Sequence, residues 1–342
     1  MNLVDNNTDI FFFIFLLLFN IIFFIYFNKI STFLKLNDIA DNVRKFQESP
    51  IPLIGGVLLF INITFISAYA LTDLITPKSN NLFLNYRELY SFYITSTLIF
   101  LVGIYDDKYT LKPNTKFIYL FIILLMALLI DNNMTLKNIY VDYLNRSIPL
   151  YNFSIFFTIL CFLLFINAVN MFDGINMQVG IYVFLILLFF IISKISVFLC
   201  VGLMFPIIVF LILNFKGRTF LGDNGSLLIA YVLGYIFIKS YNDNQIKDIE
   251  TIFVIMMIPG LDMLRLFFTR IMQGKNAFHP DTNHIHHRFT KFYGKKSVFI
   301  IQFLIVMPAI AYLFVNKSIL IIIIGIFVYF FMIYFAKTKI IN

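Results

Sequence analysis

Two adjacent carboxylates stand where an apolar stretch gives way to polar sequence. Asp106 and Asp107 end that stretch, and Lys116 follows in the same polar segment. Carboxylates this close repel each other unless a cation or a proton lies beside them. Mg²⁺ with phosphate ligands would meet this need, because it prefers carboxylate oxygens and keeps substrate oxygens and water. Lys116 could supply positive charge to a phosphate. A solvated loop that merely ends the stretch is the alternative interpretation.

A second polar group combines two amides and a carboxylate at the end of a later apolar stretch. Asn167 and Asn170 are spaced to share one helical face, and Asp173 lies one turn further along. Such a row could hold a cation or a sugar phosphate. A simple helix C-cap that ends at Gly174 is the alternative interpretation.

A third group places glycines on both sides of an acid. In Gly222-Asp223-Asn224-Gly225-Ser226 the glycines allow close backbone approach to a ligand, and a helix is expected to begin here. Free N–H groups at that helix N-terminus could bind phosphate oxygens. A plain Asp or Ser N-cap is the alternative.

All four histidines of the chain lie within nine residues, in a segment rich in arginine and lysine. They are His279, His284, His286 and His287, and the cations around them are Arg265, Arg270, Lys275 and Arg288. The pattern H-x-H-H could be a zinc site. The surrounding positive charges suit an anion better than a second cation, so phosphate binding is favoured over zinc and over a solvated loop.

Carboxylates for a metal, amides, a helix N-terminus and a basic loop are together the parts that phosphoryl transfer needs. A metal bridges phosphate oxygens, and positive groups stabilise the charge that develops on them. The sequence has no P-loop, which argues against an ATP-driven machine. It also has no G-x-S-x-G elbow or Ser–His pairing that would indicate acyl transfer.

The elements that must position these groups are membrane-spanning helices. Of the 342 residues, 61% are hydrophobic and 13% are charged, and the mean hydropathy is +0.89. A soluble domain has about 45–50% apolar and about 25% charged residues, so a soluble globular enzyme and a disordered chain are excluded. An outer-membrane barrel is excluded as well, because its strands would alternate polar and apolar residues.

We therefore predict an all-α, polytopic integral membrane protein with about 11 transmembrane helices in a single domain, residues 1–342. The expected spans cover about residues 10–27, 53–71, 90–105, 117–130, 153–170, 179–193, 195–213, 226–240, 249–268, 298–315 and 318–336.

Charge placement predicts the orientation of these helices. The N-terminal segment MNLVDNNTD carries no Lys or Arg, so the first span is expected to be a retained helix with its N-terminus outside, and not a signal peptide. The segments then assigned to the cytoplasm hold 17 of the 26 Lys and Arg residues, and the external segments hold 8. This puts the C-terminus and the four polar groups on the cytoplasmic face. The net charge of +8 then faces an anionic leaflet, and no nucleic acid is expected as a partner.

At these residues the chain resembles the polyprenyl-phosphate N-acetylhexosamine-1-phosphate transferases, the family of WecA, TagO and MraY. The family patterns are D-D followed by L-x-P-x-x-K, then N-x-x-N-x-x-D-G, G-D-x-G-S and a terminal H-x-H-H loop. The chain matches them in this order across about residues 45–290, and its segment 49–56 is similar to an early P-x-P-x-x-G-G motif. The His loop is similar to that of the WecA and TagO branch. Thr110 stands where the family often has a third Asp, and Asn176 stands where D-G-x-D-G-L has its second Asp.

The resemblance implies transfer of an N-acetylhexosamine-1-phosphate from a UDP-sugar to undecaprenyl phosphate, with release of UMP. This step would initiate a cell-envelope glycan such as an O-antigen or a teichoic acid. The protein would be a multi-pass protein of the bacterial inner (cytoplasmic) membrane, in contact with membrane lipids, and a homodimer is left open. Mg²⁺ would be the cofactor, with Mn²⁺ as the alternative ion.

The resemblance also implies roles for individual residues. Asp106, Asp107 and Asp223 would be catalytic, the first two beside the lipid phosphate. The metal would be held by Asp223, Asp107 and Asp173. The residues that would bind substrate are Lys116, Asn167, Asn170, Asp173, Lys45, Arg265, His279, His284, His286 and His287.

Two other classes of function suit a helical membrane protein. A transporter or flippase of lipid-linked substrates would have polar or broken helices at the bilayer midplane, whereas here we expect the middle of each span to be apolar. A non-catalytic membrane subunit would tolerate loss of the acids, which are all present. Both are therefore kept only as alternatives to a transferase.

Overall fold

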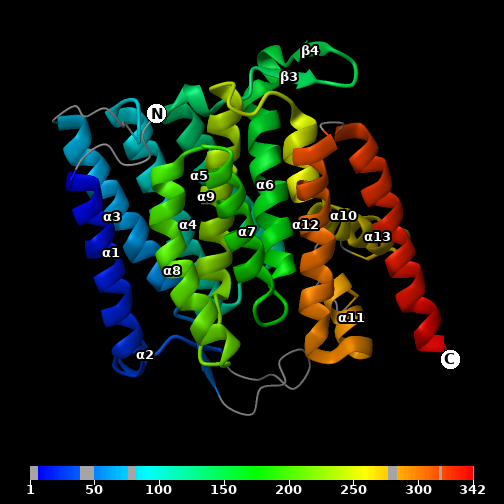
Figure 1. Cartoon of the computed structure of the whole chain (residues 1–342), viewed down its shortest axis with the longest axis horizontal. Coiled ribbons are helices and arrows are strands. Elements are labelled where there is room, and N and C mark those ends of the chain that lie inside the picture. The colour runs from blue at the N-terminus through cyan, green and yellow to red at the C-terminus, as the bar shows by residue number, and fades with distance from the viewer. Residues whose placement is uncertain (1–6, 39–49, 76–81, 276–282, 316–317, 342) are drawn as a thin grey trace.

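The computed structural model describes the chain except for residues 1–6, 39–49, 76–81, 276–282, 316–317 and 342. The described part contains thirteen α-helices and two short antiparallel hairpins (Figure 1). The helices are α1 (Asn7–Ile25), α2 (Phe27–Leu34), α3 (Gly55–Ile75), α4 (Tyr86–Tyr109), α5 (Pro113–Ile130), α6 (Ser154–Phe172), α7 (Gln178–Ile192), α8 (Val197–Phe215), α9 (Gly222–Asn242), α10 (Ile249–Met272), α11 (Ile285–Tyr293), α12 (Ser297–Val315) and α13 (Ser318–Ile341). The hairpins pair β1 (Asn37–Asp38) with β2 (Ile51–Pro52), and β3 (Asn138–Val141) with β4 (Arg146–Pro149).

The helical, polytopic class expected from the composition is confirmed. Seven helical segments in the described residues are long and apolar enough to cross a membrane, and α7 and stretches of α12 and α13 are apolar but shorter. The seven comprise α1, α3, α4, α5, α8, α10 and the segment Tyr151–Phe172 that contains α6. The count of eleven spans and the orientation in the membrane stay predictions.

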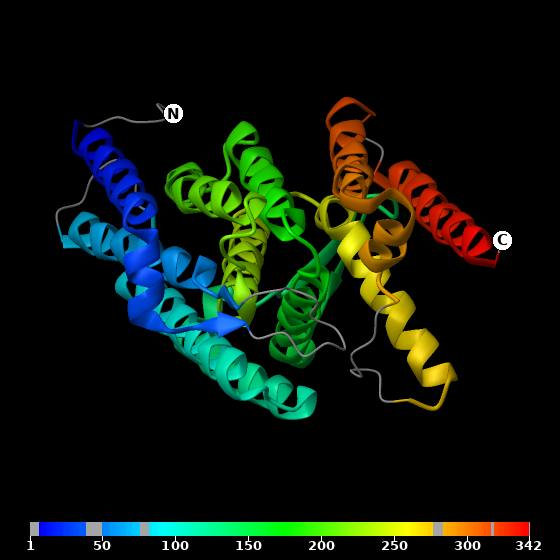
Figure 2. The ribbon, with the colours of Figure 1, turned by 90° about the horizontal axis from the view of Figure 1, so that it is seen from below.

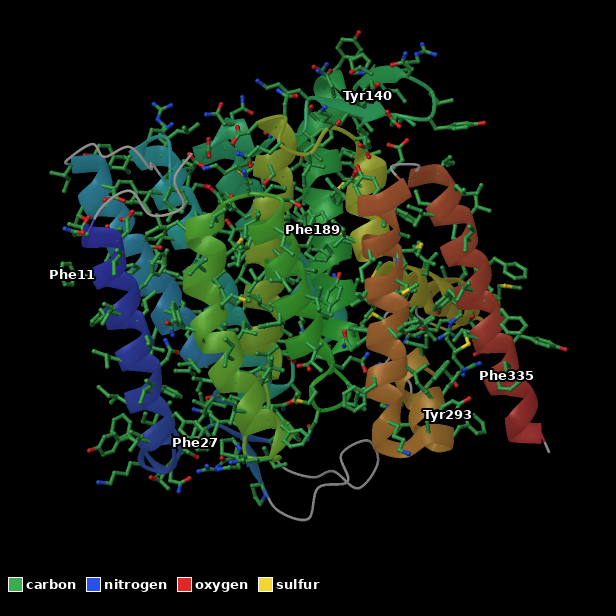
Figure 3. All side chains as sticks on the ribbon, viewed as in Figure 1. Phe11, Phe27, Tyr140, Phe189, Tyr293 and Phe335 are labelled. Atoms are coloured by element: carbon green, nitrogen blue, oxygen red, sulfur yellow. The ribbon has the colours of Figure 1, made fainter. Side chains whose placement is uncertain are left out.

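The outer surface of the helices is apolar, as lipid contact requires. Phe11 and Phe335 project from opposite flanks of the bundle (Figure 3) and are 68% and 42% exposed. Aromatic and aliphatic side chains of this kind would leave a large apolar patch in water. The apolar flanks therefore agree with a protein that sits in a bilayer.

The middle of the spans is not wholly apolar, contrary to the sequence-based expectation. Asn20 on α1 and Asn62 on α3 are buried, and the Asn20 amide donates to Asn62 Oδ1 at 2.7 Å. Asn62 donates back to Asn20 Oδ1 at 3.3 Å. Each amide thus satisfies the other, and such pairs hold membrane helices together.

Helix α9 forms the centre of the bundle and packs against α3, α4 and α6. Every residue from Asn224 through Ile238 is buried. Seen along the bundle, α10 to α13 lie to one side of this centre, with α10 packed on α6, α12 and α13 (Figure 2). The N-terminus of α9 is therefore fixed by neighbours on several sides.

The predicted polar groups gather at one end of the bundle, which is the lower end in Figure 1. The end of α4, the end of α6, the start of α9 and α11 all lie there, whereas the β3–β4 hairpin lies at the upper end. Segment 52–56 joins them, because Gly55 N and Gly56 N donate to the carbonyls of Phe220 and Leu221 at 3.2 and 3.1 Å. The early glycine motif and the third polar group are thus neighbours.

Glycines let two helices pack closely against the first turn of α9. A Cβ on Gly56 of α3 would lie 1.8 Å from Asn224 Oδ1, and one on Gly103 of α4 would lie 2.3 Å from Asn224 Cα. Neither distance is compatible with a side chain. Only glycine at these two positions allows α3 and α4 to approach so closely.

We expect a reporter fused to the C-terminus to be cytoplasmic, because the 17-to-8 bias of positive charge assigns that end to the inside. A reporter inserted between β3 and β4, in residues 142–145, should read external, because this turn lies at the opposite end of the bundle. Paired alkaline phosphatase and fluorescent protein fusions measure both positions. An external C-terminus would overturn the predicted orientation.

Candidate active site

Lys116 lies at the centre of a cluster of acids and amides. Its Nζ is 2.6 Å from Asp106 Oδ2 and 3.2 Å from Asp223 Oδ1, and it donates to Asn170 Oδ1 at 3.4 Å. Asn170 Nδ2 donates to Asp223 Oδ1 and, at 2.8 Å, to Ser226 Oγ. These residues come from α4, α5, α6 and α9. The structure thus brings the first three predicted polar groups together at one point.

The adjacent carboxylates Asp106 and Asp107 bind different partners. Asp106 pairs with Lys116. Asp107 accepts the backbone N–H groups of Asp223 at 2.8 Å and Asn224 at 3.0 Å, and also the side-chain amide of Asn224. These N–H groups belong to the first turn of α9, where unpaired donors and the helix dipole favour an anion. A carboxylate of the chain therefore occupies the donors that were expected to bind phosphate.

A polar cavity of about 420 Å³ lies beside this cluster. Its lining includes Asp107, Asn170, Asp173, Asp223 and His287. Burial, together with the negative charges of Asp223 and Asp107, raises the pKa of Asp173 to about 7. A cation in the cavity would favour the ionised carboxylate. The volume is in the range of about 300–1,000 Å³ that small-molecule sites occupy.

The cavity offers the hard oxygen donors that a divalent cation needs. Asp223, Asp107 and Asp173 all line it, and Mg²⁺ and Mn²⁺ prefer carboxylate oxygens. Among the residues that the structure describes, no three His, Cys, Asp or Glu side chains are already gathered as a metal site. Instead, the Lys116 ammonium neutralises Asp106 and Asp223. The donor chemistry fits such an ion, and binding would require the carboxylates to turn toward it.

The three described histidines have three different environments. His287 lines the cavity. His284 Nδ1 lies 3.1 Å from the Asp262 carboxylate, outside the cavity lining. His286 is buried against Gly174, where an added Cβ would lie 1.9 Å from His286 Nε2. Burial and the neighbouring His287 and His284 lower the pKa of His286 well below its usual range, so it is neutral near pH 7.

Arg265 lies in a network on α10 rather than in the cavity lining. Its guanidinium donates to Asp262 Oδ1 at 2.7 Å, to Tyr329 Oη at 2.8 Å and to the carbonyl of Asn283 at 2.8 Å. The residues that sequence reasoning missed here are Asp262 and Tyr329. Asp262 could have been noticed, because an acid within an apolar span and three residues before an arginine signals a buried pair.

The other predicted substrate residues are dispersed. Asn167 donates to the carbonyl of Leu163 in its own helix at 2.7 Å. Asn176, one of the departures from the family pattern, lines the cavity. Lys45 and His279 lie outside the described residues. Asn224, which was not among the predicted site residues, is fully buried and binds both Asp107 and the carbonyl of Leu53.

The sequence around the acid cluster matches a known family. Residues 89–241 match the sequence profile of glycosyl transferase family 4. That stretch contains the cluster of acids and amides around Lys116, namely Asp106, Asp107, Asn170 and Asp223. Over these residues the chain is similar to glycosyl transferase family 4.

Similar proteins of this family carry consistent names. An undecaprenyl-phosphate alpha-N-acetylglucosaminyl 1-phosphate transferase of Escherichia coli O157:H7 is 25% identical over 303 residues, covering 84% of this chain and 77% of that protein. The transferase of the same name from Yersinia pestis is 26% identical over 306 residues, with the same coverage of 84% and 77%. A probable undecaprenyl-phosphate N-acetylglucosaminyl 1-phosphate transferase of Bacillus subtilis is 25% identical over 263 residues, covering 73% of this chain and 68% of that protein.

These similarities confirm the prediction, made from the motifs, of an enzyme that resembles the polyprenyl-phosphate N-acetylhexosamine-1-phosphate transferases. The match to family 4 disfavours a transporter and a non-catalytic subunit. The His loop lies beyond residues 89–241, so the match to family 4 does not include it.

Proposed function

We propose that this protein transfers N-acetylhexosamine-1-phosphate from a UDP-sugar to undecaprenyl phosphate and releases UMP. One observation carries the proposal: Lys116 joins Asp106, Asp223 and Asn170 beside a polar cavity at one end of an apolar bundle. Such a place gives a water-soluble nucleotide and a lipid phosphate access to the same charges. The names of the relatives favour N-acetylglucosamine as the sugar and undecaprenyl phosphate as the acceptor.

In the proposed reaction an oxygen of the lipid phosphate attacks the β-phosphorus of the UDP-sugar. The bond between that phosphorus and the oxygen bridging to the α-phosphate breaks, and UMP leaves with the bond's electron pair. A phosphate monoester has a second pKa of about 6, so the attacking oxygen is mostly ionised at neutral pH. Asp106 and Asp107 therefore act by positioning the phosphates through Lys116 and the start of α9, and no general base is required.

The charges of the reacting phosphates need compensation. When bound, Mg²⁺ or Mn²⁺ would supply positive charge to the reacting phosphates. Asp223, Asp107 and Asp173 would hold that ion. Lys116 would move its ammonium from the Asp106–Asp223 pair toward the diphosphate, and His287 would contact the donor from the cavity wall. Asn170 would keep Asp223 oriented through its hydrogen bond.

The proposed reaction also indicates where in the cell the protein acts. The cavity would face the cytoplasm, where UDP-sugars are made, and the protein would lie in the bacterial cytoplasmic membrane. The lipid-linked product would start a cell-envelope glycan. Assembly as a homodimer stays a prediction.

The direct test of donor choice offers purified protein a panel of UDP-N-acetylhexosamines with undecaprenyl phosphate and Mg²⁺. We expect UDP-N-acetylglucosamine to give both UMP and a lipid-linked diphosphate sugar. UDP-glucose, which lacks the acetamido group, serves as the matched control donor. Equal turnover of every UDP-sugar, or of none, would contradict the proposed donor class.

Removal of divalent cations should stop transfer without unfolding the protein. Charge stabilisation by a metal contributes several kcal/mol, so EDTA should lower the rate by about 100-fold or more, and excess Mg²⁺ should restore it. The thermal unfolding of the detergent-solubilised protein should change little, because Lys116 neutralises Asp106 and Asp223 in the metal-free chain. Full activity in EDTA would refute the cation requirement.

A further inference from the structure

Asp262 is a buried carboxylate that joins three helices of the C-terminal part. It is 2% exposed on α10. Its Oδ1 accepts from Arg265 at 2.7 Å and from Tyr329 Oη of α13 at 2.8 Å. Its Oδ2 lies 3.1 Å from His284 Nδ1, and both oxygens receive the backbone N–H of Ile285 at 3.2 and 3.3 Å. A buried carboxylate is costly unless it is matched in this way.

These contacts fix the start of α11. His284 is the N-cap of α11, and Ile285 is its first residue. An acid that receives the first N–H of a helix caps it and favours its dipole. Asp262 thereby sets both the position and the direction in which α11 leaves the loop.

A second contact fixes the opposite side of α11. His286 packs on Gly174, and its Nδ1 lies 3.5 Å from Gln178 Nε2. Gln302 of α12 holds that same turn through the carbonyl of Gln178 at 2.7 Å. His286 thus docks α11 on the loop after α6, whose residues Asp173 and Gly174 line the cavity.

His287 follows directly on these two anchored histidines. The rings of His286 and His287 have centroids 4.3 Å apart, and His287 lines the cavity together with Asp107 and Asp223. A small displacement of α11 would therefore move the His287 imidazole relative to the acid cluster.

We infer that Asp262 and Tyr329 are positioning residues that hold α11 so that His287 meets the donor, while His284 and His286 serve as its anchors. This inference rests on the proposed transfer reaction. It divides the H-x-H-H pattern into two structural histidines and one that contacts substrate. Arg265 belongs to the same positioning network and neutralises Asp262.

The test compares Asp262→Asn and Tyr329→Phe with the matched control Tyr235→Phe. Tyr235 is also a buried tyrosine whose hydroxyl donates to a carboxylate, that of Glu88, but it lies in the second half of α9 and outside the cavity lining. With UDP-N-acetylglucosamine, Asp262→Asn should raise the donor KM by about 10- to 100-fold, the effect of losing hydrogen bonds to a charged group. The KM for undecaprenyl phosphate should change less than twofold. Tyr329→Phe should also raise the donor KM more than the KM for undecaprenyl phosphate, but by a smaller factor than Asp262→Asn.

A double-mutant cycle with His287→Ala separates positioning from general damage. If Asp262 acts through His287, Asp262→Asn should add little to the donor KM of His287→Ala. Additive effects, equal increases of both KM values, or a wild-type donor KM in Asp262→Asn and Tyr329→Phe would overturn the inference. If Asp262→Asn fails to fold, Tyr329→Phe takes its place in the cycle with His287→Ala, and the same results support or overturn the inference.

Amide hydrogen exchange gives a readout that does not depend on the reaction. Asp262→Asn or Tyr329→Phe should speed exchange across residues 284–293 and leave residues 222–226 unchanged, because only the former are capped by Asp262. Tyr235→Phe should leave both segments unchanged. Unaltered exchange in 284–293 would overturn the inference. A wild-type protein that uses no UDP-sugar would instead refute the proposed function, and the exchange result would still stand.

Discussion

Replacing Asp223 with asparagine should lower transfer by about 10²- to 10³-fold while the protein still folds and inserts. Asparagine keeps the shape of the side chain and can still accept from Asn170 and Lys116, which contact Asp223 Oδ1. It removes the negative charge that would hold a cation at the cavity. Steady-state UMP release, normalised to folded protein, measures the effect.

The matched control for Asp223→Asn is Asp131→Asn. Asp131 is also a largely buried acid, but it follows α5 near the upper end of the bundle and accepts the backbone N–H of Asn133 at 3.1 Å. Its replacement should leave turnover unchanged. Wild-type turnover in Asp223→Asn, or an equal loss in Asp131→Asn, would contradict a special role for Asp223.

Lys116→Gln should cause the second large loss. It leaves the carboxylates of Asp106 and Asp223 without the ammonium that lies 2.6 and 3.2 Å from them. Breaking a buried ion pair by removing one partner costs about 3–5 kcal/mol. We expect a lower Tm together with turnover reduced by about 100-fold or more, because the phosphates also lose a positive partner.

Lys239→Gln separates these two effects. Lys239, in the last turn of α9, pairs with the buried carboxylate of Glu88. Its side chain is about as buried as that of Lys116, at 15% against 13% exposure. Its loss should lower the Tm in a similar way but leave the turnover of the folded fraction unchanged. A parallel loss of turnover in both variants would mean that Lys116 acts through stability alone.

Much of the fold and the acid cluster was predictable because both depend on patterns that a single chain displays. Apolar runs of span length predict helices in lipid, and alternation of their ends brings Asp106, Asn170 and Asp223 to one face. The glycines around Asp223 correctly predicted the start of α9. The contact between segment 52–56 and residues 220–221 was not predictable, since it depends on how closely α3 approaches α9.

The separate roles of the histidines in the His loop could not be predicted from the sequence. Three histidines of one pattern were all expected to bind substrate, yet His284 and His286 face protein groups and His287 faces the cavity. That division depends on the direction of α11, which Asp262 and Tyr329 set from distant parts of the chain. Likewise, the N–H groups at the start of α9 bind Asp107 instead of a ligand. Contacts of this kind, between residues on different helices, leave no periodic pattern in the sequence.

The most direct measurement of the central claim uses UDP-N-acetylglucosamine labelled with ³²P in its β-phosphate, incubated with wild-type protein, undecaprenyl phosphate and Mg²⁺. Transfer of a sugar phosphate breaks the bond on the α side of the β-phosphorus. The label should therefore appear in the lipid product, and the released UMP should be unlabelled. Label that remains in released UDP, with sugar alone on the lipid, would contradict the account.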